Sequence, residues 1–172
     1  MSREAAMEVR PYVLAAQSFV IGSTNFVLLG LPPGWRALKG PFPPEVDRRV
    51  ERGDVSWALE GQASFALQGR LGGPETERAL LRLQVYPGPL RRERLLARVE
   101  EEEGIMLGGH EGLRRVGFVR KGWGPWGGFL AAASFETFCP QTGRTLHILL
   151  ESGTPQVVAA LADALSRYWR CH

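Results

Sequence analysis

The chain has 172 residues, of which 44% are hydrophobic and 23% are charged. These values are ordinary for a globular protein and exclude a disordered, collagen-like or coiled-coil chain. The formal net charge is +3, from 21 basic and 18 acidic residues, which is far below the charge excess of a dedicated nucleic-acid-binding domain. The 21 glycines and 12 prolines indicate many turns and therefore a chain rich in β-structure.

The N-terminal part predicts a loose leader at 1–7, followed by two strands at 9–20 and 25–31 that a turn at 22–24 separates. The sequence LPPGW at 31–35 ends the second strand, because proline has no N–H for a sheet ladder. Polar residues interrupt the apolar stretch and it has no clean cleavage site. We therefore expect neither a membrane span nor a signal peptide, and a cytoplasmic protein.

The next segments predict a loop at 39–44, one or two helical turns at 45–52, and then a hairpin. Its strands, 63–71 and 77–86, flank Gly72-Gly73-Pro74, which is typical of a tight turn. Apolar residues alternate with Arg82 and Gln84 in the second strand. This period of two, with one wet face, indicates an antiparallel sheet.

A helix is predicted at 90–103, after Pro87-Gly88-Pro89. Its apolar stripe consists of Leu95, Leu96 and Val99. Arginines stand at its N-terminal end and the glutamates 100–103 at its C-terminal end, which is the unfavourable orientation in the helix dipole. Packing of the stripe, or contacts with a partner, must therefore hold this helix. We interpret the glutamates as a solvated helix end rather than a catalytic carboxylate pair.

The C-terminal half predicts a loop at 108–112, a short strand at 115–121, and a hairpin of strands 129–138 and 145–151. A final helix begins with Thr154 as its N-cap and Pro155 in the first helical position. Its expected buried face comprises Val157, Val158, Leu161, Leu165, Tyr168 and Trp169.

The order of these elements predicts a single α+β domain spanning 1–172. The hairpins exclude an all-parallel sheet. The simplest arrangement is one twisted antiparallel sheet of about six strands with two main helices packed on it.

This order, together with the sequence NFVLLGLPPGW at 25–35, resembles the PsbP-like fold. That is the fold of the oxygen-evolving-complex P subunit and of small Ran-binding nuclear transport factors. Paired strands, a helix after a strand-then-proline step, a long hairpin and a last helix complete the similarity over 25–169. The resemblance implies a protein-binding scaffold, and it transfers no catalytic residue.

The candidate partner-binding residues are Arg120, Lys121, Trp123 and Trp126, on the glycine-rich loop 122–128. An exposed aromatic residue on a basic loop can dock a partner or stack on a base. In the alternative interpretation, both tryptophans fold back onto the core while the glycines make a turn. The glycine spacing does not match a phosphate-binding loop.

Of the two cysteines, Cys139 is expected to be a buried thiol and Cys171 a thiol on a frayed tail, with a disulfide between them as the alternative. A zinc site from His110, Cys139 and His147 lacks the tight ligand pairs that metal sites usually show. A Cys139 nucleophile with His147 as its base lacks an orienting acid. We therefore expect no catalytic residue, no metal and no cofactor.

The sequence thus predicts a non-enzymatic protein-binding or scaffold domain that binds another protein or itself. One alternative is a nucleic-acid accessory protein, with the basic residues Arg91, Arg92, Arg94, Arg98, Arg114, Arg115, Arg120 and Lys121. Another is a small-ligand carrier with a pocket near the Gly-Trp loop. Lys39 and Lys121 are the only lysines, an arginine bias that is compatible with thermophily.

Overall fold

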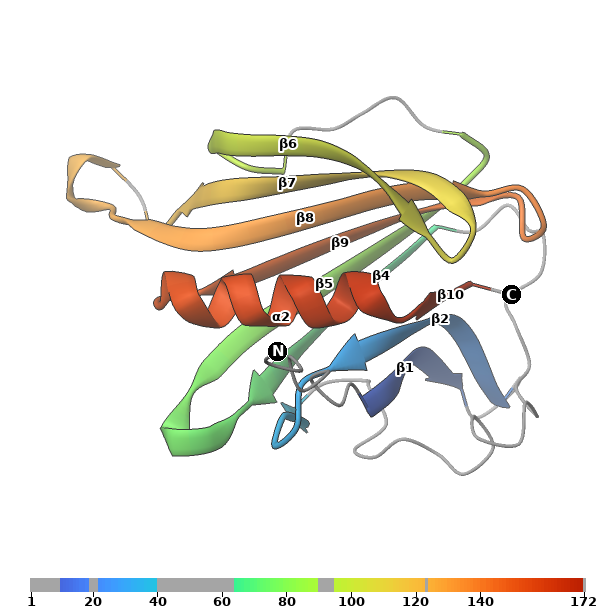
Figure 1. Ribbon diagram of the computed structural model, residues 1–172, viewed down its shortest axis with the longest axis horizontal. Coiled ribbons are helices and arrows are strands. Elements are labelled where there is room, and N and C mark those ends of the chain that lie inside the picture. The colour runs from blue at the N-terminus through green and yellow to red at the C-terminus, as the bar shows by residue number, and fades with distance from the viewer. Residues whose placement is uncertain (1–9, 19–21, 40–63, 90–94, 123, 172) are drawn as a thin grey trace, which may run out of the picture.

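The computed structural model describes residues 10–18, 22–39, 64–89, 95–122 and 124–171 (Figure 1). The leader predicted at 1–7 and the helical turns predicted at 45–52 lie outside the described residues.

Seven strands form a large antiparallel sheet in the order β3-β4-β5-β9-β8-β7-β6 (Figure 1). These strands are β3 (Arg36–Lys39), β4 (Phe65–Gly72), β5 (Arg78–Pro87), β6 (Arg98–Leu107), β7 (His110–Arg120), β8 (Phe129–Cys139) and β9 (Arg144–Ser152). The two predicted hairpins, β4–β5 and β8–β9, are confirmed. Their alternating apolar residues and tight turns are local signals, which the sequence carries in full.

A second, three-stranded sheet has the order β1-β2-β10. It consists of β1 (Arg10–Ser18), β2 (Gly22–Leu31) and β10 (Trp169–Arg170). The prediction of two N-terminal strands is confirmed, but their place in one common sheet is wrong. The short strand β10 pairs with the middle of β2, so the C-terminal end of the chain completes a sheet that its N-terminal part begins.

The helix α2 (Pro155–Arg167) confirms the predicted final helix. It contacts β8 and β9 of the large sheet and β2 of the small sheet, so it lies between the two sheets (Figure 1). Its last predicted turn is wrong: Tyr168 has extended backbone angles and is 38% exposed, and Trp169 begins β10. Trp169 is nevertheless buried, because β10 presents it to the core.

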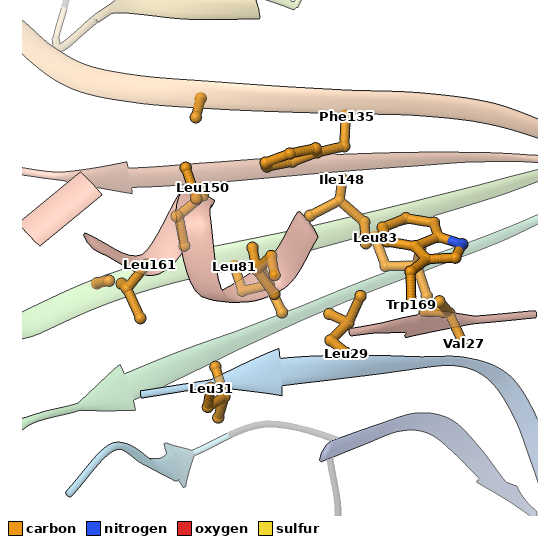
Figure 2. Close-up of a cluster of buried hydrophobic side chains, with 14 of the residues drawn as sticks. Val27, Leu29, Leu31, Leu81, Leu83, Phe135, Ile148, Leu150, Leu161 and Trp169 are labelled. Atoms are coloured by element: carbon orange, nitrogen blue, oxygen red, sulfur yellow. The ribbon is translucent and has the colours of Figure 1, made fainter. Parts of the chain in front are cut away.

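The main core fills the space between the large sheet, α2 and β2 (Figure 2). Figure 2 labels its residues from β2 (Val27, Leu29, Leu31), β5 (Leu81, Leu83), β8 (Phe135), β9 (Ile148, Leu150), α2 (Leu161) and β10 (Trp169). Alternate residues of each strand supply this face. The core therefore joins all the layers of the fold.

The helix predicted at 90–103 is wrong, because residues 98–103 belong to strand β6 and 95–97 are not helical. In the antiparallel pairing with β7, Glu102 stands opposite Arg115 and Glu103 opposite Arg114. Opposite charges across a strand pair stabilise it, whereas the same charges would oppose a helix dipole. Charged residues also suit β6 because it is an edge of the described sheet and they discourage further strand pairing.

Two of the three residues in the apolar stripe of that helix, Leu95 and Leu96, pack on the outer face of the large sheet instead, whereas Val99 is exposed. Leu96 forms a second buried cluster with Val119, Ala132 and Leu149, and Leu95 packs against it. Burial of these leucines therefore needs only an extended segment that crosses the sheet. The expected fold of two helices on one sheet is wrong: the described residues are mostly β-structure, in two sheets, and α2 is their one α-helix.

The ion pair between Glu102 on β6 and Arg115 on β7 predicts a small loss of stability when the exposed Glu102 is replaced. Arg115 Nε lies 2.8 Å from Glu102 Oε2, and the side chain of Glu102 is 48% exposed. We expect Glu102→Gln to lower the free energy of unfolding by about 0.5 kcal/mol, measured by urea denaturation. Glu101→Gln is the control, because Glu101 is exposed on the same strand and stands opposite the uncharged Val116; it should change stability less. A loss above ~2 kcal/mol for Glu102→Gln would show that solvent does not screen the pair.

Within the described ranges, no helix has both the length and the apolar character that a membrane crossing requires.

Candidate functional site

The β7–β8 connection extends beyond the other elements at the left of Figure 1. Its neck is closed where the Lys121 N–H donates a hydrogen bond to the Gly128 carbonyl at 2.8 Å. Gly127 is required there, since a Cβ on it would meet the Lys121 carbonyl oxygen at 2.5 Å. A short 3₁₀ turn, η2 (Gly124–Trp126), forms the tip. The glycines thus hold a narrow neck with a tryptophan at its end.

The side chains at this tip are largely open to solvent. Trp126 is 94% exposed and Phe129 is 62% exposed, while Arg120 and Lys121 are also exposed. Trp123 lies outside the described residues. Trp126 therefore does not fold back onto the core, and it stands with two cations and a second aromatic side chain. We name Arg120, Lys121, Trp126 and Phe129 the hairpin tip.

An open groove of about 510 Å³ lies beside the neck, on the outer face of the large sheet. Its lining includes Arg82, Arg120 and Lys121 with the apolar Leu96 and Leu149. Arg82 Nη2 lies 3.6 Å from Glu151 Oε1, which also lines the groove. This groove lies where the small-ligand-carrier alternative of the sequence analysis expects a pocket, near the Gly-Trp loop.

A second cluster lies at the end of the sheet where β8 and β9 turn. The side-chain donor atoms of His110, Cys139 and Cys171 all lie within 4.8 Å of one another. Cys139 and Cys171 form no disulfide and both are buried, so the frayed tail expected at Cys171 is wrong; His110 is half-buried. We name these three residues the His-Cys-Cys cluster. His172 lies outside the described residues.

The sheet register and a tight turn bring the cluster together. Gly112 of β7 pairs with Thr137 of β8. Because the strands are antiparallel, His110, two residues before Gly112, lies at the end of β8 that carries Cys139, two residues after Thr137. Gly108 and Gly109 have φ of +60° and +85° and make the β6–β7 turn just before His110. A Cβ on Gly108 would meet the Trp169 carbonyl oxygen at 2.9 Å. This close contact sets the turn against β10 and therefore beside Cys171.

The two thiols of the cluster differ in acidity. Burial raises the pKa of Cys139, but hydrogen bonds from Thr142, Cys171 and the backbone of 141–142 outweigh burial and leave the pKa of Cys139 below its ordinary value. Burial raises the pKa of Cys171 strongly, and its hydrogen bond to Cys139 raises it further. Cys139 is therefore the more acidic thiol of the pair and Cys171 the less acidic one.

His147 does not join Cys139, and the period of the strands is the reason. Cys139 pairs with Arg144, whereas His147 pairs with Glu136. The two positions are offset by three residues on each strand, so His147 faces the outer side of the sheet while Cys139 faces the core. Neither the zinc site from His110, Cys139 and His147 nor the Cys139–His147 pair, both of which the sequence analysis set aside, is assembled here. Cys171 takes the place of His147 in the cluster.

On the outer face, His147 belongs to a row of polar side chains. Its Nε2 lies 3.9 Å from Glu136 Oε2, and Arg115 Nη1 lies 3.8 Å from the same oxygen. The Tyr86 ring meets the His147 ring edge-on, with 5.7 Å between centroids. The row continues to Glu102 through Arg115. These side chains pair with one another across neighbouring strands.

Comparison with protein-family models, curated proteins and solved structures finds no match to the chain. The assignment of a function therefore depends on the geometry of the hairpin tip and of the His-Cys-Cys cluster.

Proposed function

We propose that the protein is a non-enzymatic binding domain that docks another protein through the hairpin tip. The observation that carries this proposal is the 94% exposure of Trp126 at the end of a closed neck. Tryptophan is highly buried on average, and it is among the residues that contribute most to protein–protein interfaces. A tryptophan held out into solvent by a closed neck is suited to insertion into a partner.

The charges at the tip indicate the chemistry of the partner. Arg120 and Lys121 stand beside the exposed aromatic side chains of Trp126 and Phe129. The surface that fits them is an apolar pocket with acidic residues at its rim, because complementary charge guides association and fixes register. A cytoplasmic location belongs to this proposal. The resemblance to the PsbP-like fold stays a prediction, and one of its steps, the helix at 90–103, is a strand from Arg98 onward.

Trp126→Ala tests this function with little effect on folding, because the side chain is almost fully exposed. Affinity capture with the wild-type protein and with the variant identifies proteins that need the tryptophan. For a partner then purified, we expect Trp126→Ala to weaken binding by about thirtyfold or more in a calorimetric titration. Lys121→Glu should slow association, and that effect should diminish at high salt.

Met106→Ala is the matched control, since Met106 is 60% exposed on β6 and is not part of the hairpin tip. It should leave binding unchanged. Partner binding that survives both Trp126→Ala and Lys121→Glu would refute the hairpin tip as the docking site. Light scattering on the purified chain identifies the case in which the partner is a second copy, and Trp126→Ala should then shift the mass toward the monomer.

The nucleic-acid alternative has less support from the placement of its arginines. Arg115 is buried and pairs with Glu102 and Glu136, and 91–94 lie outside the described residues. Single-stranded oligonucleotides that bind with steep salt dependence and lose affinity in Trp126→Ala would favour it. The ligand-carrier alternative has the groove of about 510 Å³ beside the neck, lined by Arg82, Arg120, Lys121 and Glu151. Because Arg82 pairs with Glu151, this alternative assigns binding of a small anion to Arg120 and Lys121.

A further inference from the structure

The His-Cys-Cys cluster gathers the side chains of this chain that best bind soft metals. The sequence contains two cysteines and three histidines. Both cysteines and one histidine meet in this cluster, although Cys139 follows His110 by 29 positions and Cys171 follows Cys139 by 32. They come from three elements: the start of β7, the end of β8 and the residue that follows β10. Two thiols and an imidazole form a donor set that favours zinc over hard cations.

The distances match a metal site that needs only a small contraction. Zinc bonds of about 2.3 Å to sulfur and about 2.0 Å to nitrogen place tetrahedral ligand atoms roughly 3.6–3.8 Å apart. The three donor atoms here lie within 4.8 Å of one another. Movement of each side chain by less than about 1 Å therefore creates the coordination geometry, which ordinary rotamer adjustment supplies.

We infer that His110, Cys139 and Cys171 bind a zinc ion that clips the C-terminal strand β10 to the large sheet. His110 and Cys139 belong to the large sheet, whereas Cys171 directly follows β10 of the small sheet. Coordination thus ties the two sheets together at the end of the core that Trp169 fills. A short strand of two residues gains an anchor that its own pairing with β2 does not provide.

The cluster offers zinc three protein ligands, and a water molecule at the solvent-facing side takes the fourth tetrahedral position. Cys139 and Cys171 are 0% and 1% exposed, while the half-buried His110 leaves an approach for the ion. The turn that carries His110 already contacts Trp169 through Gly108. Zinc therefore binds to a preorganised site, and its binding free energy adds to the stability of the folded chain.

Cobalt(II) is the probe, because bound thiolates give it charge-transfer absorption and four-coordinate sites give it intense visible bands. The full-length chain is purified under reducing conditions and titrated with Co²⁺. We expect both absorptions to saturate at one equivalent and to disappear when Zn²⁺ is added. Zn²⁺ should also raise the melting temperature of the wild-type protein.

Three variants and one control connect the signal to the cluster. Cys139→Ala and Cys171→Ala should each remove the one-equivalent signal and the stabilisation by zinc. His110→Ala changes a half-buried residue and keeps the fold measurable. It should weaken cobalt binding by at least about tenfold, since even outer partners of metal ligands contribute that much. Glu111→Ala, the exposed next residue on β7, should bind like the wild-type protein.

Two results would overturn the site. The first is a folded, fully reduced wild-type chain that shows no thiolate-to-cobalt absorption at one equivalent. The second is a signal that persists unchanged in both His110→Ala and Cys171→Ala. Thiol titration of the protein before reduction shows whether the two cysteines form a disulfide. If they do, and the reduced chain binds no cobalt, the cluster is a covalent cross-link and the zinc site is refuted. Trp126→Ala, which tests the docking function, should leave all these metal readouts unchanged.

Discussion

Phe135→Ala is expected to lower the free energy of unfolding by about 3–5 kcal/mol, the range measured for deletion of a buried phenyl ring. Phe135 is fully buried and is the largest side chain in the group with no exposure. It stands opposite Ile148 in the β8–β9 pairing and points toward the core that Figure 2 shows. Its ring lies where the strands of the large sheet meet the helix layer. The packed neighbours there cannot easily move in to fill the cavity that alanine leaves.

Phe129→Ala is the matched control for this loss, since it removes the same side chain from the same strand at a position 62% exposed. It should change stability by less than about 0.5 kcal/mol. Urea denaturation followed by circular dichroism measures both variants. If Phe135→Ala proves too unstable to purify, Phe135→Leu is expected to cost about 1.5 kcal/mol and keeps the measurement feasible. Equal stabilities of the two alanine variants would refute this description of the core.

Gly117→Ala is expected to destabilise the protein by about 3 kcal/mol, at the upper end of the range for overpacking. A Cβ on Gly117 would lie 1.9 Å from the Arg98 carbonyl oxygen, and 3.1 Å from the Val99 Cα. The register of β6 against β7 shifts between Val99 and Glu101, which is a β-bulge. The bulge brings the backbone of β6 over Gly117. Because the atoms that Cβ meets are backbone, no side-chain rotation relieves the clash.

Gly104→Ala is the control for this substitution. Gly104 lies on β6, and a Cβ there would have nothing within 4 Å. Alanine at this position should be neutral or slightly stabilising, since it restricts the unfolded chain. Hydrogen exchange should show that Gly117→Ala increases opening of the β6–β7 pair in particular. A Gly117→Ala protein as stable as Gly104→Ala would contradict the close approach of the two strands.

The sequence predicted those elements whose signal is local. The hairpins β4–β5 and β8–β9 combine alternating apolar residues with turn residues, and α2 begins at Thr154-Pro155 and buries a regular apolar face. The segment 90–103 was predicted wrongly, because a short stripe of leucines does not distinguish a helix from an extended segment on a sheet. The pairing of β6 with β7 along its whole length makes this segment a strand, and it joins residues such as Glu102 and Arg115 that are 13 positions apart.

The candidate sites show the same division. The sequence singled out Arg120, Lys121 and Trp126 of the hairpin tip because glycines, tryptophans and cations are adjacent on one loop. The exposure of Trp126, and the exposed Phe129 beside this loop, came only from the structure. The alternation of side chains along a strand was the available signal that places His147 and Cys139 on opposite faces of the sheet. Once the hairpin register places Arg144 opposite Cys139, His147 must face the other side. No local signal indicated Cys171, since it reaches the cluster only through the pairing of β10 with β2.

The sequence by itself determined the turns, the antiparallel hairpins, the final helix and the loop that carries Trp126. Each of these depends on interactions between residues close along the chain, which periodicity and turn chemistry describe. Only the tertiary structure decided that the strands divide into two sheets, that 98–107 is a strand, and that His110, Cys139 and Cys171 meet. Those outcomes depend on burial and pairing between distant segments, whose free energy appears only when the segments have packed together.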